Sequence, residues 1–276
     1  LFGSAVQIGR KIKELIKEEI GLTASVGIAP NKFLAKVASD LEKPDGFVVI
    51  TQESAADLMA DLPVSRLLGV GKKSVARLNT LGIRKVKDLL AHRLDELEMV
   101  LGQWAHTLVE LARGHDSRPV TVGHGPKSIG AERTFSNNIA NNDELHRILD
   151  KLVDESAARL RKAGYVCRTV SIKARYPDFV THTRSMSLTA PTARTHDIRQ
   201  AARVLLDERL KRAGRALRLL GVQVSNLIKT KTGQLALFQS KEDDLHDKLD
   251  EVRDHITKKF GKGSIAWANL VKKKDE

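Results

Sequence analysis

The run Thr23-Ala-Ser-Val-Gly-Ile-Ala-Pro-Asn-Lys-Phe-Leu-Ala-Lys-Val-Ala-Ser-Asp-Leu-Glu-Lys-Pro-Asp-Gly46 carries the strongest structural signal in this 276-residue sequence. Residues 22–29 predict a short strand, and Pro30 suits the first turn of a helix that is predicted to extend to about Leu41. The apolar face of this helix consists of Phe33, Leu34, Val37 and Ala38. Pro44-Asp45-Gly46 then predicts a tight turn, because proline fixes φ and glycine tolerates a positive φ.

The quoted run closely resembles the late palm segment of Y-family DNA polymerases, in the DinB or DNA polymerase IV branch. The resemblance implies that residues 1–51 form the C-terminal part of a polymerase palm with α/β structure. It also implies that Lys43 contacts the triphosphate of an incoming deoxynucleoside triphosphate, a role that suits a compact cation. Judged as a single residue, Lys43 is better explained as a solvated surface side chain.

Length and composition indicate a multidomain globular protein. A chain of 276 residues predicts two or three domains, and its 41% hydrophobic and 29% charged residues are typical of soluble domains. No apolar run reaches the roughly 18 residues that span a bilayer, so we expect no membrane partner. The single Cys167 excludes an internal disulfide and is expected to lie in a core. A reducing, cytoplasmic setting follows as the expectation.

The net charge of +13 is concentrated in one block. Residues 127–230 carry 20 basic and 10 acidic side chains, whereas residues 1–126 carry 17 and 15. Such a block predicts a surface for a polyanion, and nucleic acid is the polyanion that we expect. The competing interpretation is an ordinary solvated surface.

Residues 52–117 predict an all-helical domain, which the resemblance identifies as the polymerase thumb. Short helices are expected at 62–68, 72–81, 85–91 and 103–113. Residues 118–126 contain two prolines and two glycines without apolar periodicity, and this composition predicts a linker.

The thumb contains the motif Leu68-Gly-Val-Gly-Lys-Lys73, which looks like a helix-hairpin-helix. Two glycines permit a sharp turn and leave amide N–H groups at the start of the next helix free to bind a phosphodiester. Because no base edge is involved, binding would be independent of sequence. The predicted contacts to the DNA backbone are Gly69, Gly71, Lys72, Lys73 and Ser74. The alternative is an ordinary turn between helices, and glycosylases and nucleases also use the motif.

Residues 127–230 predict the order β-α-β-β-α-β. The strands are expected at 127–135, 166–176, 180–188 and 217–227, and the helices at 142–163 and 195–213. This order predicts a two-layer α+β unit, and it matches the little finger domain of the family. The first helix carries an apolar stripe, and Val166 and Val170 are expected to share the core-facing side of the second strand.

The central strands are predicted to have one polar face. Small hydroxyls alternating with long cations can lie flat on a phosphate backbone, and they are too short and repetitive to read bases. In the resembling family this sheet lies in the major groove and contacts mainly the backbone. The predicted backbone contacts are Lys127, Ser128, Arg133, Thr169, Ser171, Lys173, Arg175, Thr183 and Ser185. The alternative is the solvated face of a half-covered sheet.

Residues 231–276 combine a short peptide with a charged helix. The peptide Gln234-Leu-Ala-Leu-Phe238 resembles the motif by which bacterial polymerases dock into the sliding clamp. The resemblance implies that Gln234, Leu235, Leu237 and Phe238 contact the clamp. The alternative is a peptide that the tail helix packs onto its own domain.

The resemblance as a whole implies a DNA-directed DNA polymerase, a nucleotidyltransferase that copies damaged templates with low fidelity. Such enzymes use two Mg²⁺ ions held by Asp and Glu residues, and no residue here matches those ligands. We therefore expect a fragment without catalytic or metal-binding residues, which binds primer-template DNA and the clamp without extending primers. The alternative is a non-catalytic, DNA- and clamp-binding adaptor of polymerase ancestry. A nuclease or glycosylase is disfavoured, because the sequence contains no recognisable arrangement of catalytic residues.

Overall fold

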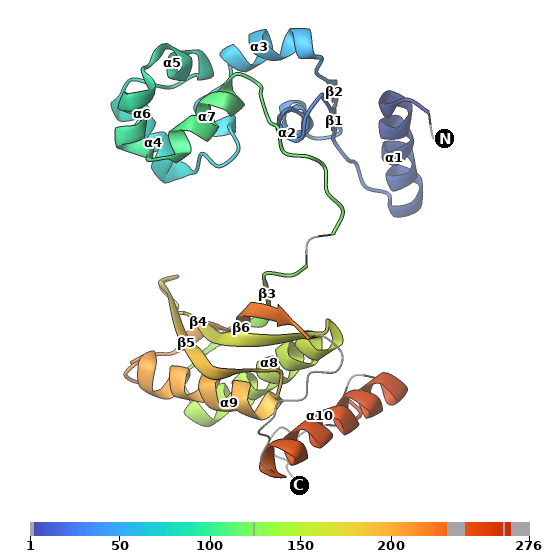
Figure 1. Ribbon diagram of the computed structural model, residues 1–276, viewed down its shortest axis with the longest axis vertical. Coiled ribbons are helices and arrows are strands. Elements are labelled where there is room, and N and C mark those ends of the chain that lie inside the picture. Colours follow the sequence, from blue (N-terminus) through green and yellow to red (C-terminus); the bar gives the residue numbers. More distant parts are fainter. Residues whose placement is uncertain (1–2, 124, 231–240, 262, 266–276) are drawn as a thin grey trace. The chain divides into compact units, whose positions relative to one another are not determined.

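The computed structural model describes residues 3–123, 125–230, 241–261 and 263–265 (Figure 1). The chain divides into two compact units, Leu1–Gly123 and His124–Glu276. The expected α+β class is confirmed. None of the described helices combines the length and the apolarity that crossing a membrane would need.

The first unit begins with two helices and a two-stranded parallel sheet. Helix α1 (Ala5–Ile20) precedes strand β1 (Val26–Ile28), helix α2 (Lys32–Leu41) and strand β2 (Phe47–Val49), and the two strands pair in parallel. The side chain of Asn31 caps α2 by accepting a backbone hydrogen bond of 2.9 Å. The predicted apolar face of α2 is buried, so the strand–helix–turn order predicted from the quoted run is confirmed.

Short helices make up the rest of the first unit. They are α3 (Gln52–Ala60), the 3-10 turn η1 (Val64–Arg66), α4 (Lys72–Thr80), α5 (Val86–Ala91), α6 (Leu94–Leu101) and α7 (Trp104–Ala112). Helices α4, α5 and α7 lie close to their predicted positions, whereas α3 and α6 were not predicted. All of these elements contribute to one apolar core together with α2.

The helix predicted at 62–68 is wrong, and only the turn η1 forms there. The backbone of this segment pairs with the residues before α5 instead. The N–H of Val64 donates to the carbonyl oxygen of Arg84 at 2.9 Å, and an isolated bridge joins Pro63 to Lys85. A backbone that is paired in this way cannot continue the i to i−4 bonds of an α-helix.

The second unit is a four-stranded sheet with helices on one face (Figure 1). Its elements are β3 (Ser128–Ile139), α8 (Asn142–Lys162), β4 (Tyr165–Arg175), β5 (Thr181–Thr192), α9 (Thr195–Val204), the π turn η2 (Leu205–Arg209) and β6 (Leu217–Lys229). The strands lie antiparallel in the order β3-β6-β4-β5. The predicted order of strands and helices is confirmed, although the second helix stops short of the predicted residue 213.

Helices α8 and α9 seal one face of this sheet. Their apolar stripes meet every second residue of the strands, as the two-residue period of a strand requires. The buried set includes Leu145, Leu149, Leu152, Val153, Val170, Ile172, Ala174, Ile198, Ala202, Leu220, Val222 and Val224. Since these residues point toward the helices, the alternate residues of each strand are left on the opposite face.

Cys167 lies in this core, as predicted, but Val166 does not. The Cys167 side chain is fully buried, and burial raises the pKa of its thiol to about 11. The prediction that Val166 shares the core-facing side with Val170 is wrong, because Val166 is only half-buried. The pairing of β4 with β5 shifts register between Cys167 and Thr169, and such a bulge resets which residues face inward.

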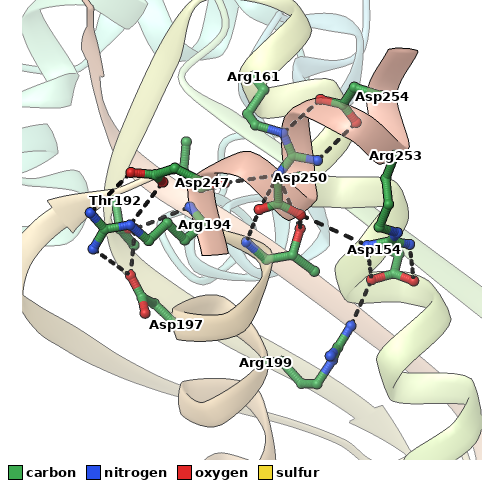
Figure 2. A network of polar contacts seen from close by, with 12 residues as sticks. Asp154, Arg161, Thr192, Arg194, Asp197, Arg199, Asp247, Asp250, Arg253 and Asp254 are labelled. Carbon is green, nitrogen blue, oxygen red and sulfur yellow. Dashed lines mark hydrogen bonds and ion pairs between the residues drawn. The ribbon is translucent and has the colours of Figure 1, made fainter. Parts of the chain in front are cut away.

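Helix α10 (Lys241–Phe260) packs on the helical layer through polar side chains (Figure 2). Arg161 of α8 donates to Asp254 at 2.7 and 2.9 Å and to Asp250 at 3.0 Å. Burial alone would lower the pKa of Arg161, but its hydrogen bond to Asp254 and the nearby carboxylate charges raise it. The apolar side chains Leu245, Leu249 and Val252 of α10 are exposed, so charge pairing holds this helix in place.

Asp250 of α10, which lies far from α9 in the sequence, also caps that helix. Its carboxylate accepts hydrogen bonds from the N–H of Thr195, at 2.7 Å, and from the Thr195 hydroxyl, at 2.6 Å. Only 4% of Asp250 is exposed. The first N–H groups of a helix lack partners within the helix, and a carboxylate there satisfies a donor and is favoured by the helix dipole. The contact therefore joins α8, α9 and α10 at one point.

Replacing Asp250 by Asn should destabilise the second unit. The change leaves Arg161 with one buried partner fewer and weakens the cap of α9, so we expect a loss of about 3 kcal/mol in the free energy of unfolding. Urea unfolding followed by circular dichroism measures this loss. The matched control is Asp244→Asn on the exposed side of α10, which should change stability by less than about 0.5 kcal/mol. Equal stability of the two variants would contradict the role of Asp250.

Candidate nucleic-acid interface

The face of the second unit's sheet opposite α8 and α9 carries mostly polar side chains and is called here the open face. Its positions follow from the register of the paired strands. They are Ser128, Gly130, Glu132 and Thr134 of β3, Leu219, Gly221, Gln223 and Ser225 of β6, Thr169, Ser171, Lys173 and Arg175 of β4, and Thr181, Thr183, Ser185 and Ser187 of β5. Hydroxyl groups therefore occur on all four strands of this face, both cations lie on β4, and β6 contributes the buried Leu219 and Gly221 beside Gln223 and Ser225.

The polar side chains of the open face bind one another across the strands. The Ser171 hydroxyl donates to that of Ser185 at 3.0 Å, and Arg175 Nε donates to Thr181 Oγ1 at 2.9 Å. On the other side of the face, Gln223 donates to the Ser128 hydroxyl at 2.6 Å. These bonds hold the donors and acceptors in a fixed pattern along the sheet, which suits contact with a regular phosphate backbone.

Glu132 was missed in the sequence, although strand alternation from Ser128 places it on the open face. Its carboxylate accepts a hydrogen bond of 2.9 Å from Lys173 Nζ. A predicted phosphate contact is therefore already paired with an acid. Arg133, the next residue, lies on the side of the helices, with Nη2 4.0 Å from Glu155 Oε1 of α8. Lys127 precedes β3 and is exposed.

Much of the basic excess of residues 127–230 lies in the helical layer instead of the open face. Arg199 donates to Asp154 at 2.9 Å, and Arg203 donates to the fully buried Asp150 at 2.7 Å. Arg194 binds Asp247 of α10 through two hydrogen bonds (Figure 2). The basic excess in the sequence is therefore spread over two faces of this unit, and part of it holds helices together.

The glycine motif of the first unit forms a tight turn between η1 and α4. Gly69 has φ +90°, and a Cβ there would lie 2.8 Å from Cζ2 of Trp104, so glycine is required. Gly71 is the N-cap of α4, and no side chain caps this helix. The side chains of Lys72 and Lys73 are exposed and Ser74 is half-buried. The N-terminus of α4 thus presents backbone donors beside two cations, an arrangement that suits a phosphate.

Lys43 lies just after α2 and pairs with a carboxylate of that helix. Its Nζ is 2.5 Å from Asp40 Oδ1, and Lys36 binds the other oxygen of Asp40. Hydrogen bonds from Lys36 and Lys43 lower the pKa of Asp40 to about 2. Lys43 is largely exposed, so an incoming phosphate can reach it only in competition with Asp40.

The remaining predictions concern the clamp peptide and metal binding. The predicted clamp contacts Gln234, Leu235, Leu237 and Phe238 lie outside the described residues. Within the described ranges, no three His, Cys, Asp or Glu side chains are grouped so that they could hold a metal ion. Among the described residues, groups that suit a phosphate lie at the open face of the second unit and, separately, at the glycine turn of the first.

Comparison with known protein families gives two matches. Residues 1–40 match the impB/mucB/samB family, and residues 126–237 match the impB/mucB/samB family C-terminal domain. Together these matches cover more than half of the chain. The first match covers the region of α1 and α2, and the second covers the sheet of the second unit.

Proteins similar to this chain include several DNA polymerases IV. That of Halorhodospira halophila is 45% identical over 225 residues, which are 82% of this chain and 63% of the relative. That of Alkalilimnicola ehrlichii is 43% identical, covering 86% of this chain and 67% of the relative. That of Desulfatibacillum aliphaticivorans is 37% identical, covering 98% and 69%. The chain spans less than two thirds of the first of these relatives.

Two solved structures resemble the fold. A Y-family DNA polymerase chimera (Dbh-Dpo4-Dbh) has a TM-score of 0.68 and 28% sequence identity, covering 83% of this chain and 66% of its own. The insertion ternary complex of Dbh DNA polymerase matches with a TM-score of 0.54 and the same identity and coverage. Both neighbours are DNA polymerases.

Replacing Gly69 by Ala should disturb the glycine turn, whereas the same change at Gly71 should not. An alanine at position 69 would place its Cβ against Trp104 and would have to adopt a left-handed backbone. We therefore expect a loss of about 2 kcal/mol in the free energy of unfolding. Gly71 has φ −83°, and a Cβ there meets nothing within 4 Å, so its variant should lose less than about 1 kcal/mol. Thermal unfolding followed by circular dichroism compares the two. A variant at Gly69 as stable as that at Gly71 would contradict this account of the turn.

Proposed function

Because this chain belongs to the DNA polymerase IV (DinB) branch of the Y-family DNA polymerases, we propose that it grips primer-template DNA for translesion synthesis. In this proposal residues 1–51 are part of the palm, residues 52–117 are a thumb with a helix-hairpin-helix, and residues 127–230 are the little finger. Residues 118–126 link the thumb to the little finger. The copying of damaged templates by the full-length enzyme is part of the same proposal.

The observation that carries the proposal is the open face. It is rich in hydroxyls, and it presents Lys173 and Arg175 from a central strand, so it can hydrogen-bond along a sugar-phosphate chain. The N-terminus of α4, with Lys72 and Lys73, offers a second phosphate site of the same chemistry. Two sites that offer hydroxyls, backbone N–H groups and cations favour a ligand that is bound through its phosphates.

The remaining partners in the proposal are a nucleotide and the sliding clamp. Lys43 would contact the triphosphate of an incoming deoxynucleoside triphosphate, displacing Asp40 from its ammonium group. Residues 234–238 would dock into the bacterial clamp through Gln234, Leu237 and Phe238. Magnesium, which the family relationship implies, finds no donor cluster among the described residues. The proposal for this chain therefore concerns binding.

Binding of duplex DNA should weaken steeply with salt and depend little on sequence. If four or five cations neutralise phosphates, the logarithm of the binding constant should fall against the logarithm of salt concentration with a slope of about −4. Fluorescence anisotropy with labelled primer-templates of unrelated sequence measures the slope, and affinities should agree within about threefold. A flat salt dependence would contradict the proposal.

The contribution of the glycine turn can be separated from general charge. The double variant Lys72→Ala with Lys73→Ala should reduce the slope by about 2 units. The control removes the same charge at Lys85 and Lys87, whose ammonium groups already pair with Asp61, and should reduce the slope by much less. An equal reduction in both variants would mean that the turn has no special role.

Clamp binding should depend on the apolar side chains of the tail peptide. The double variant Leu237→Ala with Phe238→Ala should abolish binding to a bacterial sliding clamp, because these side chains would fill the clamp's pocket, and should leave DNA affinity unchanged. Surface plasmon resonance on immobilised clamp measures the loss. The control Gln239→Ala with Ser240→Ala alters the same segment outside the motif. Unchanged clamp affinity in the first variant would refute the docking role.

A further inference from the structure

Glu132 is the single carboxylate among the open-face positions of the four described strands. It lies on β3, and its Oε2 accepts a hydrogen bond of 2.9 Å from Nζ of Lys173 on β4. Strands β3 and β4 are not neighbours, because β6 runs between them. The ion pair therefore crosses a whole strand in the middle of the surface to which we assign phosphate binding.

The crossing is possible because the intervening residue is Gly221. The register pairs Glu132 with Gly221 and Gly221 with Lys173, so the three residues lie in one row across the sheet. A Cβ on Gly221 would come within 2.9 Å of Cβ of Glu132. Any side chain at this position would displace Glu132 and stand between the two charges. Glu132, Gly221 and Lys173 therefore lie in one row, with no side chain between the acid and the lysine.

The pair is weak enough to open. The side chains of Lys173 and Glu132 are 38% and 53% exposed, and pairs this exposed contribute between about 0 and 1 kcal/mol to stability. A phosphate that binds Lys173 must displace Glu132 or sit beside it. Two like charges about 4 Å apart repel by about 1 kcal/mol in water, and by more where water is partly excluded. The acid consequently opposes the phosphate twice, as a competitor and as a like charge.

We propose that Glu132 is a built-in competitor that lowers the affinity of the open face for the DNA backbone by occupying Lys173. The inference rests on the proposed function and adds to it the control of affinity. Binding of a phosphate by Lys173 then depends on displacing Glu132, while Arg175 on the same strand keeps a neutral partner, Thr181. A face built in this way holds DNA by contacts that are readily released.

A double-mutant cycle on Glu132 and Lys173 tests the inference in the whole chain. The variant Glu132→Gln, which keeps the shape of the side chain, should tighten binding of a fluorescein-labelled primer-template about fivefold. The salt slope should steepen by about 0.9, the amount for one further neutralised phosphate. Lys173→Ala should weaken binding less than twofold in the wild-type background and about fivefold or more in the Glu132→Gln background.

The control is Glu251→Gln, which removes an exposed carboxylate from α10, on the helical side of the same unit. It should change affinity by less than about 1.5-fold, and equal melting temperatures of all variants show that the fold is intact. If Glu132→Gln binds no tighter than Glu251→Gln, or if Lys173→Ala costs the same in both backgrounds, the inference is overturned and the proposed function stands. Failure of the wild-type chain to bind any duplex overturns the proposed function and the inference with it.

Discussion

The second unit is governed by the two-residue period of its strands. Two helices can cover only one face of a four-stranded sheet, so alternate side chains must be apolar toward α8 and α9 and polar on the other side. Val170, Ile172 and Ala174 are buried, while Ser171, Lys173 and Arg175 between them face outward. The core that stabilises the unit and the surface proposed to bind DNA are thus formed by alternate residues of the same strands, and neither can shift register without destroying the other.

Local sequence patterns were enough to predict most elements of this fold. The apolar stripe of α8 and the alternation in β4 and β5 each point to one type of structure, and the order of strands and helices leaves few ways to pack two layers. The glycine turn could also be predicted, because two closely spaced glycines permit a sharp turn, and Gly69 does occupy a left-handed position in the structure. The hydroxyl rows of the open face follow from the same alternation.

Features that depend on distant partners could not be predicted. The segment 62–68 has helical composition, but pairing with residues near Arg84 decides its backbone. The bulge after Cys167 depends on the path of β5, and the charge count could not tell a free arginine from one bound to Asp150 or Asp154. Glu132 was overlooked for a related reason, since its importance appears only once Gly221 and Lys173 are placed in one row.

The cap that Asp250 provides has a consequence for the order in which the chain can be completed. Thr195 and Asp250 are 55 positions apart, and all four strands are synthesised before the acid. A nascent chain ending at Lys229 has its full sheet and both covering helices, yet Arg161 and the first turn of α9 still lack a buried carboxylate. The cap of α9 can therefore be completed only once α10 has been made, and a chain that ends before it lacks the carboxylate at that helix end.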